Sequence, residues 1–151
     1  MNTDTINHLL RYETRYKGAF PCDMIPDFTD QEYSVVVNTD NATKDGEHWT
    51  AVIVTRDIVY YFDSFGRHYN NKSFPDDYRL ILRKLVSGKS LKYNDKVLQS
   101  FQSNTCAEFC IHFIKKFYED VPFFSIFRNF TLDLCSNDKK VVSFVKHLQL
   151  L

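Results

Sequence analysis

The chain has 151 residues, of which 44% are hydrophobic and 16% aromatic, and its 19 basic residues balance 19 acidic ones. This length suits a single domain over residues 1–151, and the composition is that of a globular protein with a real core, which argues against intrinsic disorder. A formal net charge of zero gives no global attraction for a polyanion, so we expect no requirement for nucleic acid.

The sequence contains no signal for export or for a membrane. No apolar run approaches the roughly 20 residues that span a bilayer, and the first ten residues lack the basic and apolar regions of a signal peptide. We therefore expect a protein that is not secreted, does not enter a membrane and stays in a reducing compartment. In such a compartment the cysteines are expected to be free thiols. They are Cys22, Cys106, Cys110 and Cys135.

The first half of the chain predicts a short helix, a loop and three strands. Residues 3–12 have the apolar spacing of an amphipathic helix, and Gly18–Pro26 is predicted to be a structured loop because it contains glycine and two prolines. Runs of β-branched and aromatic residues predict strands at 34–38, 49–55 and 58–63. The last two strands are separated only by Arg56 and Asp57, which indicates a hairpin.

The second half is mainly helical. Helices are predicted at 75–87, 106–118 and 138–148, and a strand at 91–98. The helix at 106–118 repeats apolar residues every three or four positions, so we expect it to be buried. Strands in the middle of the chain, with helices before, between and after them, indicate an α+β fold rather than a regular βαβ series.

Cys106 is a candidate nucleophile because it begins this buried helix. The unpaired N–H groups of a helix N-terminus favour an anion and so lower the pKa of a thiol. Cys110 lies one turn further along and is expected to face the core. The alternative is that Cys106 is simply a small buried residue, as many cysteines are.

His48 and Asp63 are the candidates for a base and its orienting carboxylate. His48 precedes the first hairpin strand and Asp63 ends the second, so a tight turn between these strands makes the two side chains neighbours. A carboxylate beside an imidazole fixes its tautomer and favours the protonated form, as a general base requires. A surface ion pair at the end of a strand is the alternative interpretation.

Gln99 is a candidate donor to an oxyanion, since it lies seven residues before Cys106 at the expected end of a strand. Gln102 competes with it, and spacing alone does not separate the two.

Four stretches carry a resemblance to a known family: GAFPCDMIP at 18–26, GEHWTAVIV at 46–54, YYFDSFG at 60–66 and LQSFQSNTCAEFC at 98–110. In this order they resemble the adenovirus protease, or adenain-like, family of cysteine peptidases, which occurs in DNA viruses and virus-like transposons. The resemblance implies a papain-like variant of the adenain type. In this fold helices flank a central mixed or antiparallel sheet, and the nucleophile begins a buried helix.

The resemblance also assigns roles to residues. It implies His48 as the base, Asp63 as the acidic third member, Gln99 as the oxyanion donor and Cys106 as the nucleophile. Trp49, which follows the base in the family, is assigned to substrate binding beside the site, with a place in the core as the alternative. One departure is Ala107, since the family usually has glycine after the nucleophile, and a methyl group there would crowd the path of the substrate if it faced the cleft.

The partners implied are protein or peptide substrates of viral type, cut after small residues such as glycine, with no cofactor and no metal. We expect a monomer in the host cytoplasm or nucleus, with packaging in the virion as an option. The regions that hold the family's activating peptide do not align with this chain, so a peptide activator is left open.

Three alternatives remain. A protease for ubiquitin-like modifiers shares the fold and the order of groups, but usually has Asp before and Gly after the nucleophile, where this chain has Thr105 and Ala107. The second alternative is a protease fold that has lost its activity and serves as a binding or structural protein. The third alternative is a structural zinc site, for which the ligands would be Cys106, Cys110 and His112.

Overall fold

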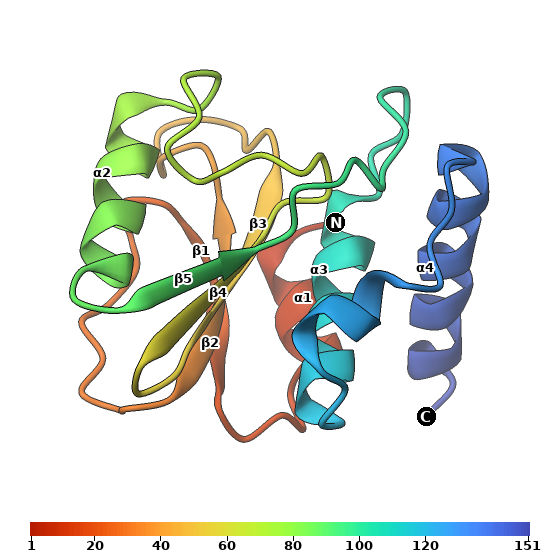
Figure 1. The fold of residues 1–151 in the computed structure, drawn as a ribbon, viewed down its shortest axis with the longest axis horizontal. Helices are drawn as coiled ribbons and strands as arrows, with labels where there is room; N and C mark the ends of the chain where they lie inside the picture. Colours follow the sequence, from red (N-terminus) through yellow and green to blue (C-terminus); the bar gives the residue numbers. More distant parts are fainter.

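The computed structural model describes all 151 residues and contains one five-stranded sheet with helices on both faces (Figure 1). The elements in chain order are α1 (Thr3–Leu9), β1 (Tyr16–Pro21), β2 (Tyr33–Asn38), β3 (Trp49–Val54), β4 (Ile58–Phe62), α2 (Asp76–Val86), β5 (Ser90–Tyr93), α3 (Cys106–Tyr118), the 3-10 helix η1 (Phe123–Phe127) and α4 (Leu134–Gln149). The predicted α+β class is confirmed.

The sheet is mixed, and its strands lie in sequence order from β1 to β5. The two outer pairs, β1–β2 and β4–β5, are parallel, whereas β2–β3 and β3–β4 are antiparallel. Both faces are covered, which explains the three consecutive valines of β2. Val36 packs in the cluster beneath α1 and α3, while Val35 and Val37 pack in the cluster beneath α2.

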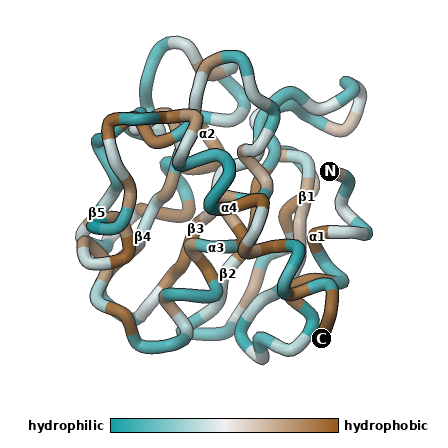
Figure 2. The backbone as a smooth tube through the Cα atoms, turned by 90° about the vertical axis from the view of Figure 1, so that its right-hand side faces the viewer, coloured by the Kyte–Doolittle hydropathy of each residue, from teal (hydrophilic) through white to brown (hydrophobic).

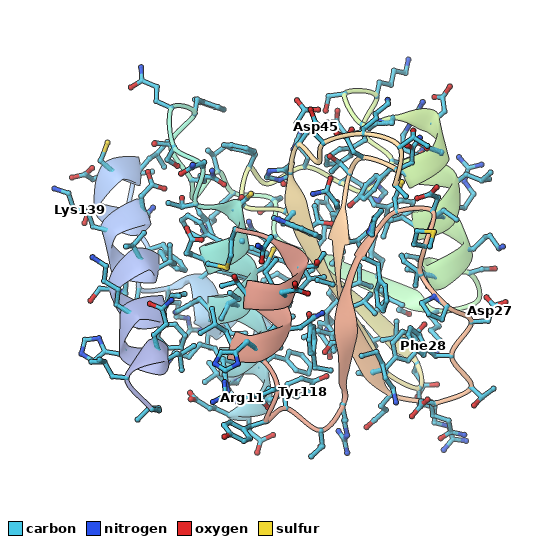
Figure 3. The ribbon with its side chains drawn as sticks, turned by 180° about the vertical axis from the view of Figure 1, so that it is seen from behind. Arg11, Asp27, Phe28, Asp45, Tyr118 and Lys139 are labelled. Carbon is cyan, nitrogen blue, oxygen red and sulfur yellow. The ribbon has the colours of Figure 1, made fainter.

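Helix α3 is the centre of the larger cluster, since its apolar residues pack on β3 while α4 and η1 cover its outer side. Figure 2 shows hydrophobic segments running through the strands in the middle of the molecule, whereas the outer loops are largely hydrophilic. Seen from behind, α4 is the outermost helix, and Lys139 points away from the rest of the molecule (Figure 3). None of the helices has the length and apolar character needed to cross a membrane.

The hairpin and the buried helix lie where the sequence predicts them, but β1 does not. It occupies Tyr16–Pro21, partly within the stretch predicted to be a loop. Pro21 is tolerated because it ends an edge strand, where a missing N–H leaves no ladder bond unmade. Gly18 adopts φ 143° at the point where the register with β2 shifts, so the residues that suggested a loop instead shape a short irregular strand.

Three other elements have different bounds from those predicted, and one element was not predicted. Helix α1 ends at Leu9 rather than at residue 12, and η1 was not predicted. Strand β5 ends at Tyr93 because the side chain of Asn94 bonds both N–H and C=O of Lys96 and turns the chain, so Gln99 lies in a loop and not at the end of a strand. Helix α4 begins at Leu134, capped by Asp133, whose carboxylate accepts from the N–H of Ser136.

Candidate active site

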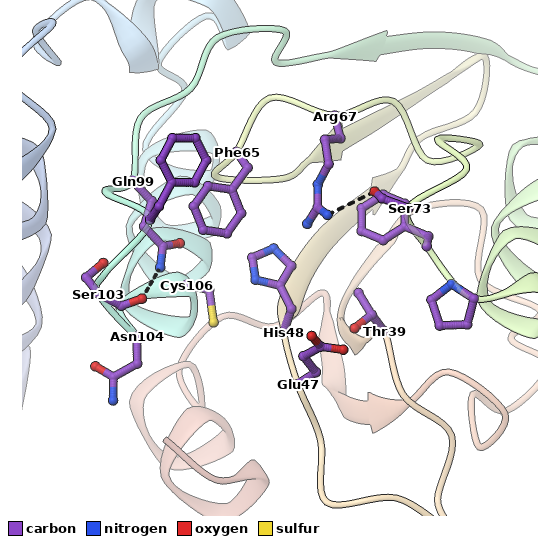
Figure 4. Close-up of a pocket in the computed structure, with 13 residues that line it drawn as sticks. Thr39, Glu47, His48, Phe65, Arg67, Ser73, Gln99, Ser103, Asn104 and Cys106 are labelled. Atoms are coloured by element: carbon purple, nitrogen blue, oxygen red, sulfur yellow. Dashed lines mark hydrogen bonds between the residues drawn. The ribbon is translucent and has the colours of Figure 1, made fainter.

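A pocket of about 300 Å³ opens where the ends of β3 and β4 approach the N-terminus of α3, and it brings together three of the predicted residues (Figure 4). His48, Gln99 and Cys106 all line it. Asp63 lies behind His48 and is fully buried. The structure thus places four residues from three separate stretches of sequence around one cavity.

His48 and Asp63 are in direct contact, as the hairpin predicts. The antiparallel register pairs Ala51 with Phe62, so the residue just before β3 and the residue just after β4 meet at the same edge of the sheet. Nε2 of His48 lies 2.5 Å from Oδ1 of Asp63. This bond occupies one ring nitrogen and leaves Nδ1 for a partner in the pocket.

Asp63 is also held by Arg67, a residue that the sequence analysis missed. The backbone N–H of Arg67 and its Nε donate to Oδ2 of Asp63 at 3.1 and 2.8 Å. The chain folds back through Gly66, which adopts φ 73° and has no room for a side chain, since a Cβ there would lie 2.6 Å from the backbone of Lys96. Glycine followed by arginine, four residues after the carboxylate, is the signal that would have indicated this contact.

Pairing outweighs burial in setting the pKa values of His48 and Asp63, and both shifts favour the charged form. Burial opposes the charge of His48, but hydrogen bonding and charge attraction from Asp63 and Cys106 outweigh it and raise the pKa of His48 to about 9. Burial also opposes ionisation of Asp63, yet His48 and Arg67 hold the pKa of Asp63 below its ordinary value. The imidazole is therefore protonated at neutral pH.

Cys106 is an activated thiol, whereas Cys110 is not. Burial opposes the Cys106 thiolate, but hydrogen bonding and charge attraction from His48, and the backbone N–H of Trp49, lower the pKa of Cys106 below its ordinary value. Cys110 is fully buried, which raises its pKa well above the ordinary value, and its Sγ donates to the carbonyl of Trp49 at 3.5 Å. Cys110 faces the core, as predicted from its position one turn further along the helix.

The side chain of Trp49 turns away from the pocket that contains Cys106. Its ring is buried, and Nε1 donates to the carbonyl of Met1 at 3.1 Å. The ring lines a neighbouring cavity of about 470 Å³, formed largely by the N-terminus and the loop that precedes β3. The assignment of Trp49 to substrate binding remains a prediction.

Gln99, and not Gln102, lies in the pocket. Gln102 is exposed, whereas Gln99 is 1% exposed and lines the cavity. Ser64, the residue after Asp63, donates from Oγ to Oε1 of Gln99 at 2.5 Å, and Nε2 of Gln99 donates to the carbonyl of Ser103 at 3.1 Å. One amide hydrogen of Gln99 is left to point at a charge in the pocket.

The loop that carries Gln99 is held by the N-terminal part of α4, a contact that no pattern in the sequence predicts. Oδ1 of Asp138 accepts from the N–H of Ser100 at 3.3 Å and from Oγ1 of Thr105 at 3.0 Å, so it joins the two ends of the loop. Nδ2 of Asn137 donates to the carbonyl of Leu98 at 3.1 Å. These contacts fix the position of Gln99 relative to Cys106.

The two remaining questions from the sequence concern Ala107 and zinc. Ala107 is 1% exposed and does not line the pocket, so its methyl group packs inward rather than into the path of a substrate. His112 lies against the rings of Phe130 and Phe144, and no group of three or more His, Cys, Asp or Glu side chains has the arrangement of a metal site. All four cysteines are free thiols.

A thiol at a helix N-terminus, an imidazole paired with a buried carboxylate and a tethered amide are the groups that a cysteine protease requires. The sequence model of the adenovirus endoprotease matches residues 16–147. The chain belongs to the adenovirus endoprotease family, which confirms the resemblance of the four sequence stretches. No curated protein matches the sequence.

Solved structures show the same fold in more distant proteins. ChlaDub1 from Chlamydia trachomatis has a TM-score of 0.56 and 18% identity over 80% of this chain and 60% of that one. The ASFV pS273R protease has a TM-score of 0.57 and 17% identity over 97% and 65%. The central domain of Lpg1148 from Legionella pneumophila has a TM-score of 0.52 and 13% identity over 98% of each chain. This chain therefore spans less than two thirds of the first two proteins.

Proposed function

We propose that the chain is a cysteine endopeptidase that cleaves viral or virus-like structural precursor proteins by acyl transfer. The observation that carries the proposal is the single pocket in which Cys106 meets a His48–Asp63 pair. The raised pKa of His48 and the lowered pKa of Cys106 favour a thiolate–imidazolium pair at neutral pH, which is the reactive form of a thiol protease.

Each of the side chains in the pocket has a role in one step of the proposed acyl transfer. The Cys106 thiolate attacks the carbon of the scissile carbonyl, whose oxygen becomes an oxyanion facing the amide of Gln99 and the backbone N–H of Cys106. When this intermediate collapses, the carbon–nitrogen bond breaks and His48 gives its proton to the leaving amine. His48 then takes a proton from water, which attacks the thioester, releases the acid and restores the thiolate–imidazolium pair.

The substrate class rests on membership of the family. Its resemblance to the adenain group favours precursor proteins cut after small residues such as glycine. The inward-packed Ala107 supports a cleft as open as that of an enzyme with glycine at this position. A location in the host cytoplasm or nucleus belongs to the same proposal.

The test is cleavage of glycine-containing precursor peptides by the native protein and by Cys106→Ala. Replacing the only thiol that lines the pocket is expected to abolish turnover while leaving the thermal unfolding midpoint nearly unchanged. Cys135→Ala, which removes an exposed thiol that does not line the pocket, is the matched control and should cleave normally. Residual cleavage by Cys106→Ala would refute the assignment of the nucleophile. Cleavage of a ubiquitin-like precursor, but not of the glycine-containing viral-type peptides, would instead favour the protease for ubiquitin-like modifiers.

A further inference from the structure

A row of aromatic rings runs from the catalytic imidazole to solvent. Phe65 stacks on His48, with ring centroids 5.2 Å apart and planes at 23°, and Phe101 stacks on Phe65 at 5.5 Å and 8°. Both phenylalanines line the active-site pocket, yet Phe101 is 77% exposed. Isolated apolar side chains are common on protein surfaces, but Phe101 differs because its ring is part of the wall of a reactive pocket.

The chemistry of the pocket places this wall on one side of the scissile bond. His48 must reach the leaving amine to protonate it, so the segment that follows the scissile bond passes beside the His48 ring. The ring that covers His48 is Phe65, and the ring stacked on its far side is Phe101. Figure 4 shows Phe65 and Glu47 on opposite sides of the imidazole. The aromatic wall therefore borders the substrate segment that follows the scissile bond. It is separated from the side chain of Glu47.

The charge beside the aromatic wall formed by Phe65 and Phe101 limits which substrate side chains can bind there. The guanidinium of Arg67 lies over the rings of Phe65 and Phe74, at 5.5 and 4.1 Å from their centroids, and Arg67 also lines the pocket. The carboxylate nearest to it, Asp63, is fully buried and already paired. An aromatic surface accepts apolar and aromatic side chains, and a guanidinium that already lies beside these rings makes a second cation there less favourable.

We infer that Phe101, supported by Phe65, forms a subsite for a bulky apolar or aromatic side chain in the first or second position after the cleaved bond. This inference rests on the proposed endopeptidase function and adds a preference on the leaving side of the substrate. Stacking of one aromatic pair is worth a factor of about threefold to tenfold in a rate or an equilibrium.

The experiment is to digest a library of peptides of mixed sequence and identify the new N-termini by mass spectrometry, because each new N-terminus reports the residues after a cut. Cuts are counted only where Cys106→Ala makes none. The variants are Phe101→Ala, Phe101→Leu and, as the matched control, Phe124→Ala. Phe124 is likewise largely exposed, but it lies on η1 and does not line the pocket.

The native protein is expected to enrich Phe, Tyr, Leu, Ile or Met after the cut by about threefold to tenfold over the library, and to deplete Lys and Arg. Phe101→Ala should bring the apolar enrichment close to the library level, whereas Phe101→Leu and Phe124→Ala should retain it. Equal enrichment in Phe101→Ala, or none in the native protein, would overturn the subsite while leaving the protease assignment intact. If the native protein makes no Cys106-dependent cuts, the proposed function fails, and the subsite with it.

Discussion

The two halves of the candidate active site are held in place by different kinds of contact. In the half that would move protons, His48 and Asp63 are 15 residues apart and meet at the ends of one hairpin. In the half that would hold the oxyanion, Gln99 lies on a loop between β5 and α3. That loop is bonded to Asn137 and Asp138 of α4, 33 to 39 residues further along the chain.

The two halves therefore differ in whether their residues would take part in the reaction or only hold a reacting group in position. In the hairpin half the reacting groups contact one another directly, so a substitution removes a catalytic group. In the loop half, Gln99 is the residue proposed to contact the oxyanion, and the residues that bond its loop to α4 act through the position they give it. Substitutions in the hairpin should therefore reduce the rate most, and those at the α4 contacts least.

The largest effect after loss of the nucleophile is expected in the hairpin half. His48→Ala removes both the base and the proton donor, and kcat/KM should fall by about 10³-fold or more. Asp63→Ala leaves the imidazole in place but removes its orientation and the contact that raises its pKa, so the loss should be smaller. Steady-state kinetics on one precursor peptide measures both. Equal losses, or a larger loss for Asp63→Ala, would place the orienting role elsewhere.

Gln99→Ala should have the next largest effect. Removing one oxyanion donor typically lowers kcat by about 10²- to 10³-fold, because the interaction exists only in the transition state. KM should change little for the same reason. Gln102→Ala is the matched control, since Gln102 has the same side chain but is exposed outside the pocket. A loss in Gln102→Ala comparable to that in Gln99→Ala would contradict the assignment.

The hairpin half could be predicted from the sequence because its contacts are local. A two-residue turn between β-branched strands fixes the register, and the register brings His48 to Asp63. The position of Cys106 at the N-terminus of a buried helix follows from the apolar periodicity of α3 in the same way. The spacing of Gln99 was informative only once the family resemblance was added, since Gln102 was otherwise an equal candidate.

The remaining parts could not be predicted because they depend on long-range packing. Nothing near Asp138 in the sequence shows that it accepts hydrogen bonds from both ends of the loop at 98–105. The position of Arg67 depends on a tight turn at Gly66 against the backbone of Lys96. Strand β1 was missed because proline and glycine favour loops in general, and only its place at the edge of the sheet makes them acceptable.

The dependence of Cys106 alkylation on pH tests the hairpin half without a substrate. In the native protein, reaction with iodoacetamide, located by mass spectrometry, should begin well below the ordinary thiol pKa of about 8.5, because His48 favours the thiolate. Proteolysis should decline as the pH rises through about 9, where His48 loses the proton that the leaving amine needs.

His48→Ala provides the comparison. Without the imidazolium, burial opposes the thiolate, so the onset of alkylation should move to higher pH, and at neutral pH the rate should fall about tenfold for each unit by which the pKa rises. Exposed Cys135 in the same sample is the internal reference and should react alike in both proteins. Superimposable Cys106 profiles for the two proteins would show that His48 does not activate the thiol.

The smallest effect on kcat is expected at the α4 contacts. Two aspartates of α4 and its N-cap allow the positioning of Gln99 to be distinguished from the stability of the fold. Asp138→Ala releases both ends of the loop at 98–105, and kcat should fall about tenfold because Gln99 is less well placed. Asp133→Ala removes the N-cap of the same helix and should lower the free energy of unfolding by about 1 kcal/mol without changing kcat more than about twofold.

Both variants are measured by denaturant unfolding and steady-state kinetics. A third variant, Asp138→Asn, retains an oxygen acceptor and is measured in the same way. If Asp138 positions Gln99 through its hydrogen bonds to the loop, Asp138→Asn should recover most of the kcat lost in Asp138→Ala. The rate of Cys106 alkylation should be the same in all three variants. A loss of kcat in Asp133→Ala as large as that in Asp138→Ala would mean that α4 supports the site only through the stability of the fold. The oxyanion half would then depend on α4 no more specifically than the hairpin half does.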